Sequence, residues 1–165
     1  MAKKCISLVM RLENQALSQY DDYNFNSFCK IGDAYLGANE DGIYSLGGDN
    51  DDGTDIDAIF QLILSDWGLP NVKRIRRIFI GYETNGDLTV KVSNDNDNWR
   101  SYTLSYSLYD RQQGNYVAVG RDGIGRYWTV RIENVDGCEF AIDSIDVLPV
   151  VLNIRKSMLL WYQQE

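Results

Sequence analysis

Residues 125–149 constrain the fold more than any other part of the chain, because they read as two alternating strands around an Asp136-Gly137 turn. Every second side chain from Trp128 to Ile132 is apolar and the residues between them are polar, which predicts one core face and one outer face. The second strand alternates imperfectly, which predicts a β-bulge near Asp143 and Ser144. The predicted core contains Trp128, Val130, Ile132, Phe140, Ile142 and Val147.

Seven segments after residue 55 have the length and composition of strands and are separated by short turns. They are residues 56–64, 73–82, 88–93, 99–108, 116–119, 127–134 and 140–148. This spacing predicts an all-β protein, with an antiparallel β-sandwich or a jelly-roll-like domain.

The first 48 residues predict β-hairpins that precede this domain. Residues 6–11 and 16–20 flank one polar turn, and residues 28–36 and 43–46 flank a second turn that contains Asp41-Gly42. The acidic, glycine-rich stretch 47–55 predicts a boundary. We therefore expect an N-terminal hairpin segment over 1–48, the β-sandwich over 49–150, and a C-terminal arm or short helix over 151–165.

Composition excludes several functional classes. The net charge of −8 and the pI near 4.5 oppose binding of free nucleic acid, which depends on concentrated Lys and Arg. The chain has no histidine, so a Ser-His-Asp or Cys-His mechanism lacks its base, and we expect no enzyme activity and no cofactor. Its three cysteines are widely spaced, which is typical of reduced thiols. The apolar run behind Lys4 is too short for a signal core or a membrane span, which indicates synthesis in a cytoplasm.

Two acidic clusters are weak candidates for a metal site. Asp49, Asp51 and Asp55 offer the hard oxygen ligands that calcium prefers. The spacing departs from an EF-hand loop, because Gly53 comes one residue early and Phe60 stands where the bidentate Glu belongs. A similar polar cluster covers residues 94–98. We interpret both as solvated turns whose side chains cap their own backbone, with no metal required for folding.

One basic run stands out in this acidic chain and predicts an interface. It consists of Lys73, Arg74, Arg76 and Arg77. The run fits a solvated strand face paired with neighbouring carboxylates, or a strip that meets the acidic loops of another copy, and we base the interface prediction on the second interpretation. Trp99 and Tyr102 complete the interface candidates, since aromatic rings at strand edges are common in interfaces. The same rings, with Tyr106 and Tyr109, also suit stacking on sugars, so a carbohydrate-binding module for host-surface recognition remains the alternative function.

Several sequence blocks resemble small tailed-bacteriophage virion proteins. They are Tyr23-Asn24-Phe25-Asn26-Ser27-Phe28, Tyr35-Leu36-Gly37-Ala38, Asp41-Gly42-Ile43-Tyr44, Lys73-Arg74-Ile75-Arg76-Arg77 and Gly125-Arg126-Tyr127-Trp128. The resemblance implies a strand-turn-strand segment before a β-sandwich, and a non-catalytic piece of the tail, tail tip or baseplate. Its implied partners are copies of itself and other phage tail proteins, and its implied location is the virion.

Overall fold

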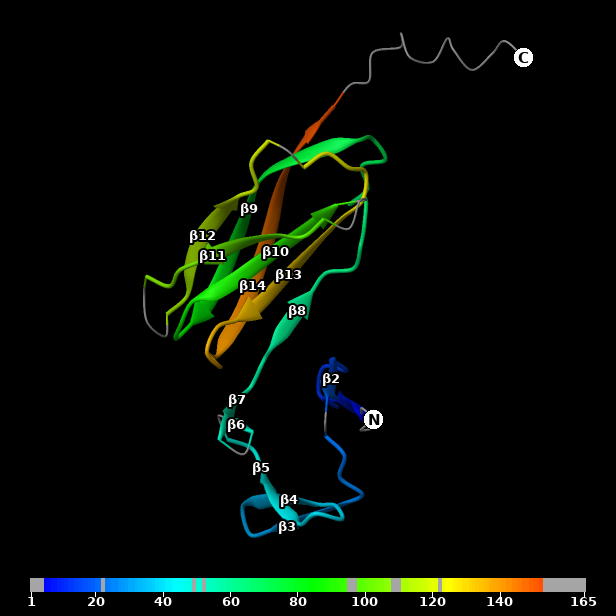
Figure 1. Ribbon diagram of the computed structural model, residues 1–165, viewed down its shortest axis with the longest axis vertical. Coiled ribbons are helices and arrows are strands. Elements are labelled where there is room, and N and C mark those ends of the chain that lie inside the picture. Colours follow the sequence, from blue (N-terminus) through cyan, green and yellow to red (C-terminus); the bar gives the residue numbers. More distant parts are fainter. Residues whose placement is uncertain are drawn as a thin grey trace, which may run out of the picture. The chain divides into compact units, whose positions relative to one another are not determined.

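The computed structural model describes residues 5–21, 23–48, 50–51, 53–94, 98–107, 111–121 and 123–152. All regular elements in these residues are strands in antiparallel sheets, so the all-β expectation is confirmed (Figure 1). Backbone contacts divide the chain into two units, Met1–Asp49 and Asn50–Glu165. The division lies one residue beyond the predicted boundary. The predicted C-terminal arm or helix falls almost entirely on residues 153–165, which lie outside the described residues.

The second unit contains two sheets and a small hairpin. The four-stranded sheet has the order β11 (Arg100–Leu104), β10 (Leu88–Asn94), β13 (Trp128–Asn134) and β8 (Ile59–Gln61). The three-stranded sheet has the order β12 (Gln113–Ala118), β9 (Lys73–Thr84) and β14 (Phe140–Val151). β6 (Asn50–Asp51) and β7 (Thr54–Asp55) form the hairpin. All seven predicted strands are present, although the segment 56–64 contributes a strand of only three residues.

The two sheets of this unit share one hydrophobic core. Ile75, Ile78 and Ile80 enter it from β9, and Val90 enters it from β10. Trp128 is 2% exposed, and Val130 and Ile132 are fully buried, as the alternation predicts. The remaining predicted members, Phe140, Ile142 and Val147, are partly buried and pack against the same cluster.

Both long strands of the three-stranded sheet contain a bulge. In β14, Ile142 pairs with Tyr82 and Ser144 pairs with Gly81, so Asp143 is the extra residue and the predicted bulge is confirmed. In β9, Arg77 pairs with Leu148 and Ile75 pairs with Pro149, so Arg76 is the extra residue. Because of this second bulge, the consecutive residues Arg76 and Arg77 are both exposed.

The first unit consists of a two-stranded and a three-stranded sheet. β1 (Ile6–Met10) pairs with β2 (Leu17–Asp21), as predicted. β3 (Ser27–Ile31), β4 (Ala34–Ala38) and β5 (Ile43–Leu46) form a meander. The prediction of one strand over 28–36 was wrong, because the chain reverses at Gly32 and Asp33. Gly32 has a φ of 60°, which glycine adopts without a steric penalty.

Candidate functional site

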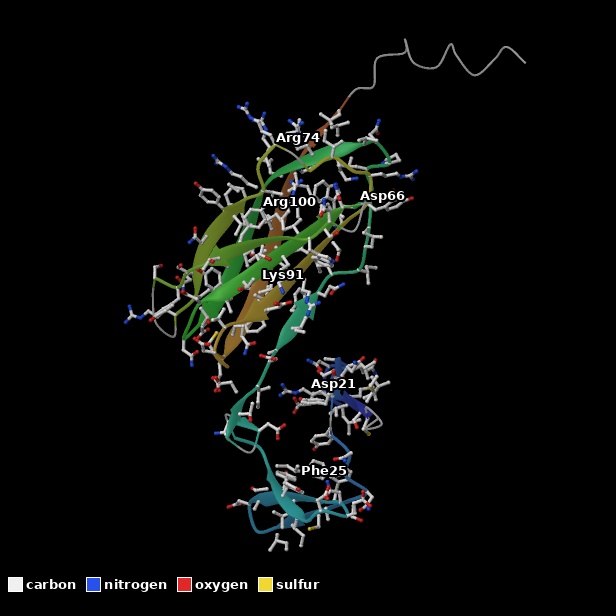
Figure 2. The ribbon with its side chains drawn as sticks, viewed as in Figure 1. Asp21, Phe25, Asp66, Arg74, Lys91 and Arg100 are labelled. Carbon is white, nitrogen blue, oxygen red and sulfur yellow. The ribbon has the colours of Figure 1, made fainter. Side chains whose placement is uncertain are left out.

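The three N-terminal blocks of the phage resemblance come together around Gly37 in the first unit. Phe25 lies in this unit (Figure 2). Its ring packs on Gly37 of β4, and a Cβ atom at that glycine would stand 2.8 Å from the ring. Four of the rings form a connected cluster. Phe25 contacts Tyr23, Phe28 and Tyr44 with centroid separations of 4.9, 6.1 and 5.5 Å. The aromatic cluster therefore packs on the backbone of Gly37, and any larger residue at this position would displace the Phe25 ring.

The opposite face of the same meander remains uncovered within its unit. Strand alternation places Ile31 and Ile43 on the face away from the aromatic cluster. Ile43 is 76% exposed and Ile31 is 66% exposed. Cys29 and Leu36 lie on that face between them, so it is apolar over three strands.

The β1–β2 hairpin also has an uncovered apolar face. Ile6, Leu8, Met10 and Leu17 share one side of the hairpin, and their exposed fractions lie between 52% and 65%. A lone two-stranded hairpin is marginally stable in water, and stable sheets bury a hydrophobic face. The first unit thus has the strands of a β structure without the burial that normally stabilises one.

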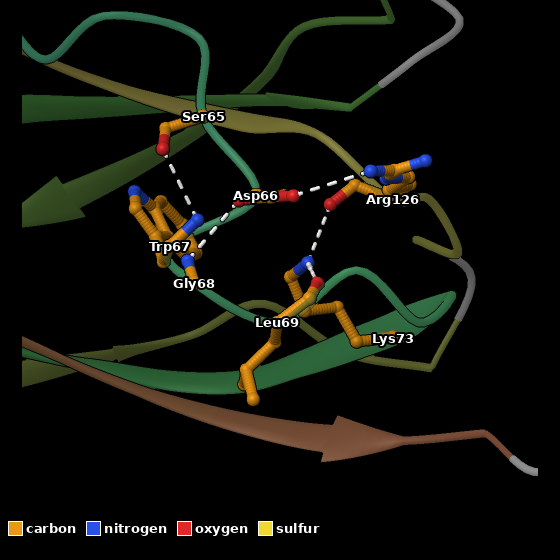
Figure 3. Close-up of polar contacts among 7 residues, drawn as sticks. All are labelled: Ser65, Asp66, Trp67, Gly68, Leu69, Lys73 and Arg126. Carbon is orange, nitrogen blue, oxygen red and sulfur yellow. Dashed lines mark hydrogen bonds and ion pairs between the residues drawn. The ribbon is translucent and has the colours of Figure 1, made fainter.

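The predicted basic strip divides between the core and the surface. Lys73 is fully buried, so its assignment as an interface residue was wrong. Its Nζ donates hydrogen bonds to the carbonyl oxygens of Leu69, at 2.8 Å, and of Arg126 (Figure 3). A buried ammonium needs such acceptors. Arg74 is half-buried, and only Arg76 and Arg77 present an exposed basic site.

The loop before β9 is fixed by side-chain hydrogen bonds and an ion pair close to the buried Lys73 (Figure 3). Asp66 Oδ1 accepts a hydrogen bond from the Gly68 amide at 3.1 Å, and Asp66 Oδ2 lies 3.4 Å from an Arg126 guanidinium nitrogen. Ser65 Oγ accepts from the Trp67 amide at 3.1 Å. These bonds fix a turn in which Trp67 and Gly68 both have positive φ. Together with Lys73 they tie this loop to the segment before β13, which is a structural role.

The outer face of the three-stranded sheet carries a row of large side chains beside Arg77. The Arg77 guanidinium lies over the Tyr116 ring, 4.8 Å from its centroid. Phe79 pairs directly with Tyr116 across the two strands, and their ring centroids are 5.6 Å apart. Beyond Phe79, Gly81 pairs with Gly114 and leaves a shallow hollow of about 520 Å³ that Ser144 and Asp146 also line. Arg, Tyr and Phe are enriched in interface cores, so this row is the second candidate surface.

The two aromatic interface candidates lie in different environments. Trp99 is 39% exposed, as expected for an interface residue. Tyr102 is partly buried against the core, and its hydroxyl donates a hydrogen bond to the carbonyl of Val119 at 2.9 Å. The expected exposure of Tyr102 was therefore wrong. Tyr106 is exposed and Tyr109 lies outside the described residues.

The predicted acidic loop folds as the β6–β7 hairpin. Asn50 Oδ1 accepts a hydrogen bond from the Gly53 amide at 2.9 Å, which is the self-capping expected of a polar turn. Asp51 and Asp55 are exposed, whereas Asp49 lies outside the described residues. In the part of the chain that the structure describes, no three Cys, Asp or Glu side chains gather as metal ligands. That calcium is not needed for folding stays a prediction.

One titratable group in the core has a shifted pKa. Burial raises the pKa of Tyr82 above its ordinary value, nearby Asp87 adds to the increase, and a hydrogen bond with Asn115 opposes it. The Tyr82 hydroxyl donates to the carbonyl of Ser105 at 3.0 Å, so the neutral phenol has a partner in the folded protein. This is the arrangement of a structural tyrosine.

Comparison with protein-family models, with curated proteins and with solved structures found no match to this chain. Across the described ranges, no helix has the length and apolar character needed to cross a membrane.

Proposed function

We propose that this protein is a non-enzymatic structural subunit of a bacteriophage virion, in the tail, tail tip or baseplate, that assembles with copies of itself and with neighbouring tail proteins. The observation that carries the proposal is the first unit, whose strands expose apolar faces on both sheets. Contiguous exposed apolar surface of this kind marks a protein–protein contact. The resemblance supports the phage assignment, because its N-terminal blocks meet in the aromatic cluster around Gly37.

Copies of the same chain are the simplest partners for these faces. A face with isoleucines on two strands can pack against the same face of another copy, and closed homo-oligomers are the commonest soluble assemblies. Ordering the first unit and assembling the protein then become one coupled process. The outer face around Arg77 and Tyr116 is available for neighbouring proteins.

The first test is the mass of the full-length protein in solution. We expect an oligomer at micromolar concentration, measured by light scattering after gel filtration, and a weaker oligomer for the double variant Ile31→Thr/Ile43→Thr. Threonine keeps the β-branch of isoleucine but lowers the apolar area. The matched control is Asp41→Asn in the exposed turn between β4 and β5, which should keep the mass of the parent. A monomeric parent protein would contradict the proposal.

The second test addresses the phage assignment and the exposed part of the basic strip. Arg76→Glu/Arg77→Glu should leave the melting temperature within a few degrees, because exposed charges contribute little to folding. The same variant should enter phage particles less efficiently than the parent, and raising the salt concentration should weaken assembly of the parent. Equal incorporation would remove the two arginines from the interface. Absence of the parent protein from purified virions would contradict the virion assignment.

Carbohydrate binding is the second candidate function, and the hollow on the outer face of the three-stranded sheet favours it. There the rings of Phe79 and Tyr116 lie next to the polar groups of Ser144 and Asp146. Carbohydrate-binding sites combine such rings with hydrogen-bonding groups. Saturable binding of a host-surface glycan to a monomeric parent protein, lost in Tyr116→Ala, would favour recognition over assembly.

A further inference from the structure

β8 is an edge strand that exposes apolar side chains. It pairs with β13 on one side and ends the four-stranded sheet on the other (Figure 1). Ile59 and Phe60 of β8 and the flanking residues Ile56, Ile63 and Leu64 have exposed fractions between 39% and 83%. No Asp, Glu, Lys or Arg occurs between Ala58 and Ser65.

The backbone of β8 has a defined set of groups that face away from β13. Leu62 donates its amide to Val130, and the carbonyl of Ala58 accepts from Asn134. In an antiparallel ladder these bonds occur at every second residue, so the even-numbered residues 58, 60 and 62 bond to β13. The amides and carbonyls of Ile59 and Gln61 therefore point toward the open edge.

The other edges of the two large sheets of this unit carry features that hinder pairing with another chain. β14 has a bulge at Asp143 and a proline at position 149, which lacks an amide hydrogen. β12 has Gly114 in its exposed stretch, and β11 begins with Arg100. Charges, proline and bulges are the usual protection of edge strands. β8 is short, but its side chains offer none of the charge protection.

We propose that β8 pairs antiparallel with β8 of a second copy, on a two-fold axis at Gln61. This register places Gln61 opposite Gln61, and Ile59 opposite Ile63, which lies two residues beyond the end of β8. On the inner face it places Phe60 opposite Leu62, which already packs against the core. The register sets apolar residues against apolar residues and opposes no two charges. The inference rests on the proposed function and specifies one of its contacts.

The exposed surface is large enough for such a contact. The exposed fractions of these five side chains add up to the surface of nearly three fully exposed side chains per copy. At roughly 150 Å² for a large side chain, two copies contribute about 800 Å² of apolar surface before the backbone is counted. Specific interfaces begin near about 1,000 Å², so pairing of the backbone edges brings the total into that range.

A cross-link at the two-fold axis tests the register directly. Opposed residues in a hydrogen-bonded antiparallel pair have Cα atoms about 5.5 Å apart, within the span of a disulfide. Under mild oxidation, we expect Gln61→Cys in the full chain to form a covalent dimer in most molecules. Peptide mapping should find the bond between two copies of the position-61 peptide, which separates it from bonds of the native cysteines. The matched control, Thr103→Cys on the exposed face of edge strand β11, should stay uncoupled.

Hydrogen exchange gives a second readout that needs no cross-link. In the assembled protein, the amides of Ile59 and Gln61 should exchange at least tenfold more slowly than in Ile59→Lys, whose charge hinders pairing at the edge. Fast exchange at both amides, or no position-61 bond in a protein that is otherwise oligomeric, would overturn the β8 pairing and leave the proposed function standing. Slow exchange in a monomer would also overturn it, since the chain itself would then cover the edge. A monomer with fast exchange would overturn both.

Discussion

Replacement of Trp128 should destabilise the second unit more than any single surface change. The indole is 2% exposed and reaches the backbone of Gly123, where an added Cβ atom would stand 2.6 Å from the ring. Its Nε1 donates a hydrogen bond to the carbonyl of Gly125 at 3.1 Å. Trp128→Ala removes both the packing and the bond, and we expect a loss of about 3–5 kcal/mol.

Trp128→Phe separates these two contributions. The Gly125 carbonyl also accepts a bond from the Lys73 amide at 3.0 Å, so loss of the indole N–H leaves no buried acceptor without a partner. The phenyl ring keeps most of the apolar contact. We therefore expect a loss of about 1–2 kcal/mol, close to the net worth of one hydrogen bond plus a small volume change.

Urea unfolding of the full chain, followed by far-UV circular dichroism, measures both values without depending on tryptophan fluorescence. With a slope of about 2 kcal/mol per M, Trp128→Ala should lower the midpoint of the main transition by roughly 2 M, and Trp128→Phe by less than about 1 M. An alanine shift below about 0.5 M would refute the placement of the indole in the core. Equal shifts for the two variants would refute the separation of packing from hydrogen bonding.

Three further predictions concern other parts of the molecule. Gly37→Ala should displace Phe25 and reduce the near-UV dichroism of the aromatic cluster, whereas Gly42→Ala, with no atom closer than 4.0 Å to the added carbon, should not; equal spectra would contradict the cluster. Because the folded protein holds the Tyr82 proton more tightly than the unfolded chain, stability should fall as the pH rises above the ordinary tyrosine pKa of 10.0. The urea midpoint should therefore begin to drop near pH 10.0 and keep falling as the pH rises through the higher pKa of the folded state, less steeply in Tyr82→Phe, and parallel declines would refute the role of this phenol. Chelators should leave the melting temperature unchanged, and a saturable rise with calcium that Asp51→Ala abolishes would show that the acidic hairpin binds metal.

Much of the second unit is predictable from the sequence, because its strands alternate and alternation is a local signal. The core positions of Trp128, Val130 and Ile132 follow from period two alone. The break in alternation at Asp143 likewise locates the bulge. The turn at Gly32 was missed, because apolar residues on both sides of it read as one continuous strand.

The surface assignments depended on partners that are distant in sequence. Lys73 looks like part of a basic run, but its ammonium bonds to carbonyls four and 53 residues away. The Tyr102 hydroxyl donates a hydrogen bond to the carbonyl of Val119, which directly follows β12. The sequence shows the polar side chain in each case and not the acceptor that allows its burial. The exposed edge of β8 was missed for the converse reason, since an apolar segment normally predicts a buried strand.

The bulge in β9 also predicts which residue the sheet could lose. Ile75 and Ile78 both face the core although they are three positions apart, because Arg76 is accommodated as one residue too many. Deletion of Arg76 would restore regular alternation, with Lys73 and Ile75 still directed inward and Arg77 still outward. A deletion elsewhere in the strand would reverse the faces of every residue on one side of it. Position 76 is therefore the natural place for length variation in β9, and it adds one exposed cation to the sheet without altering its core.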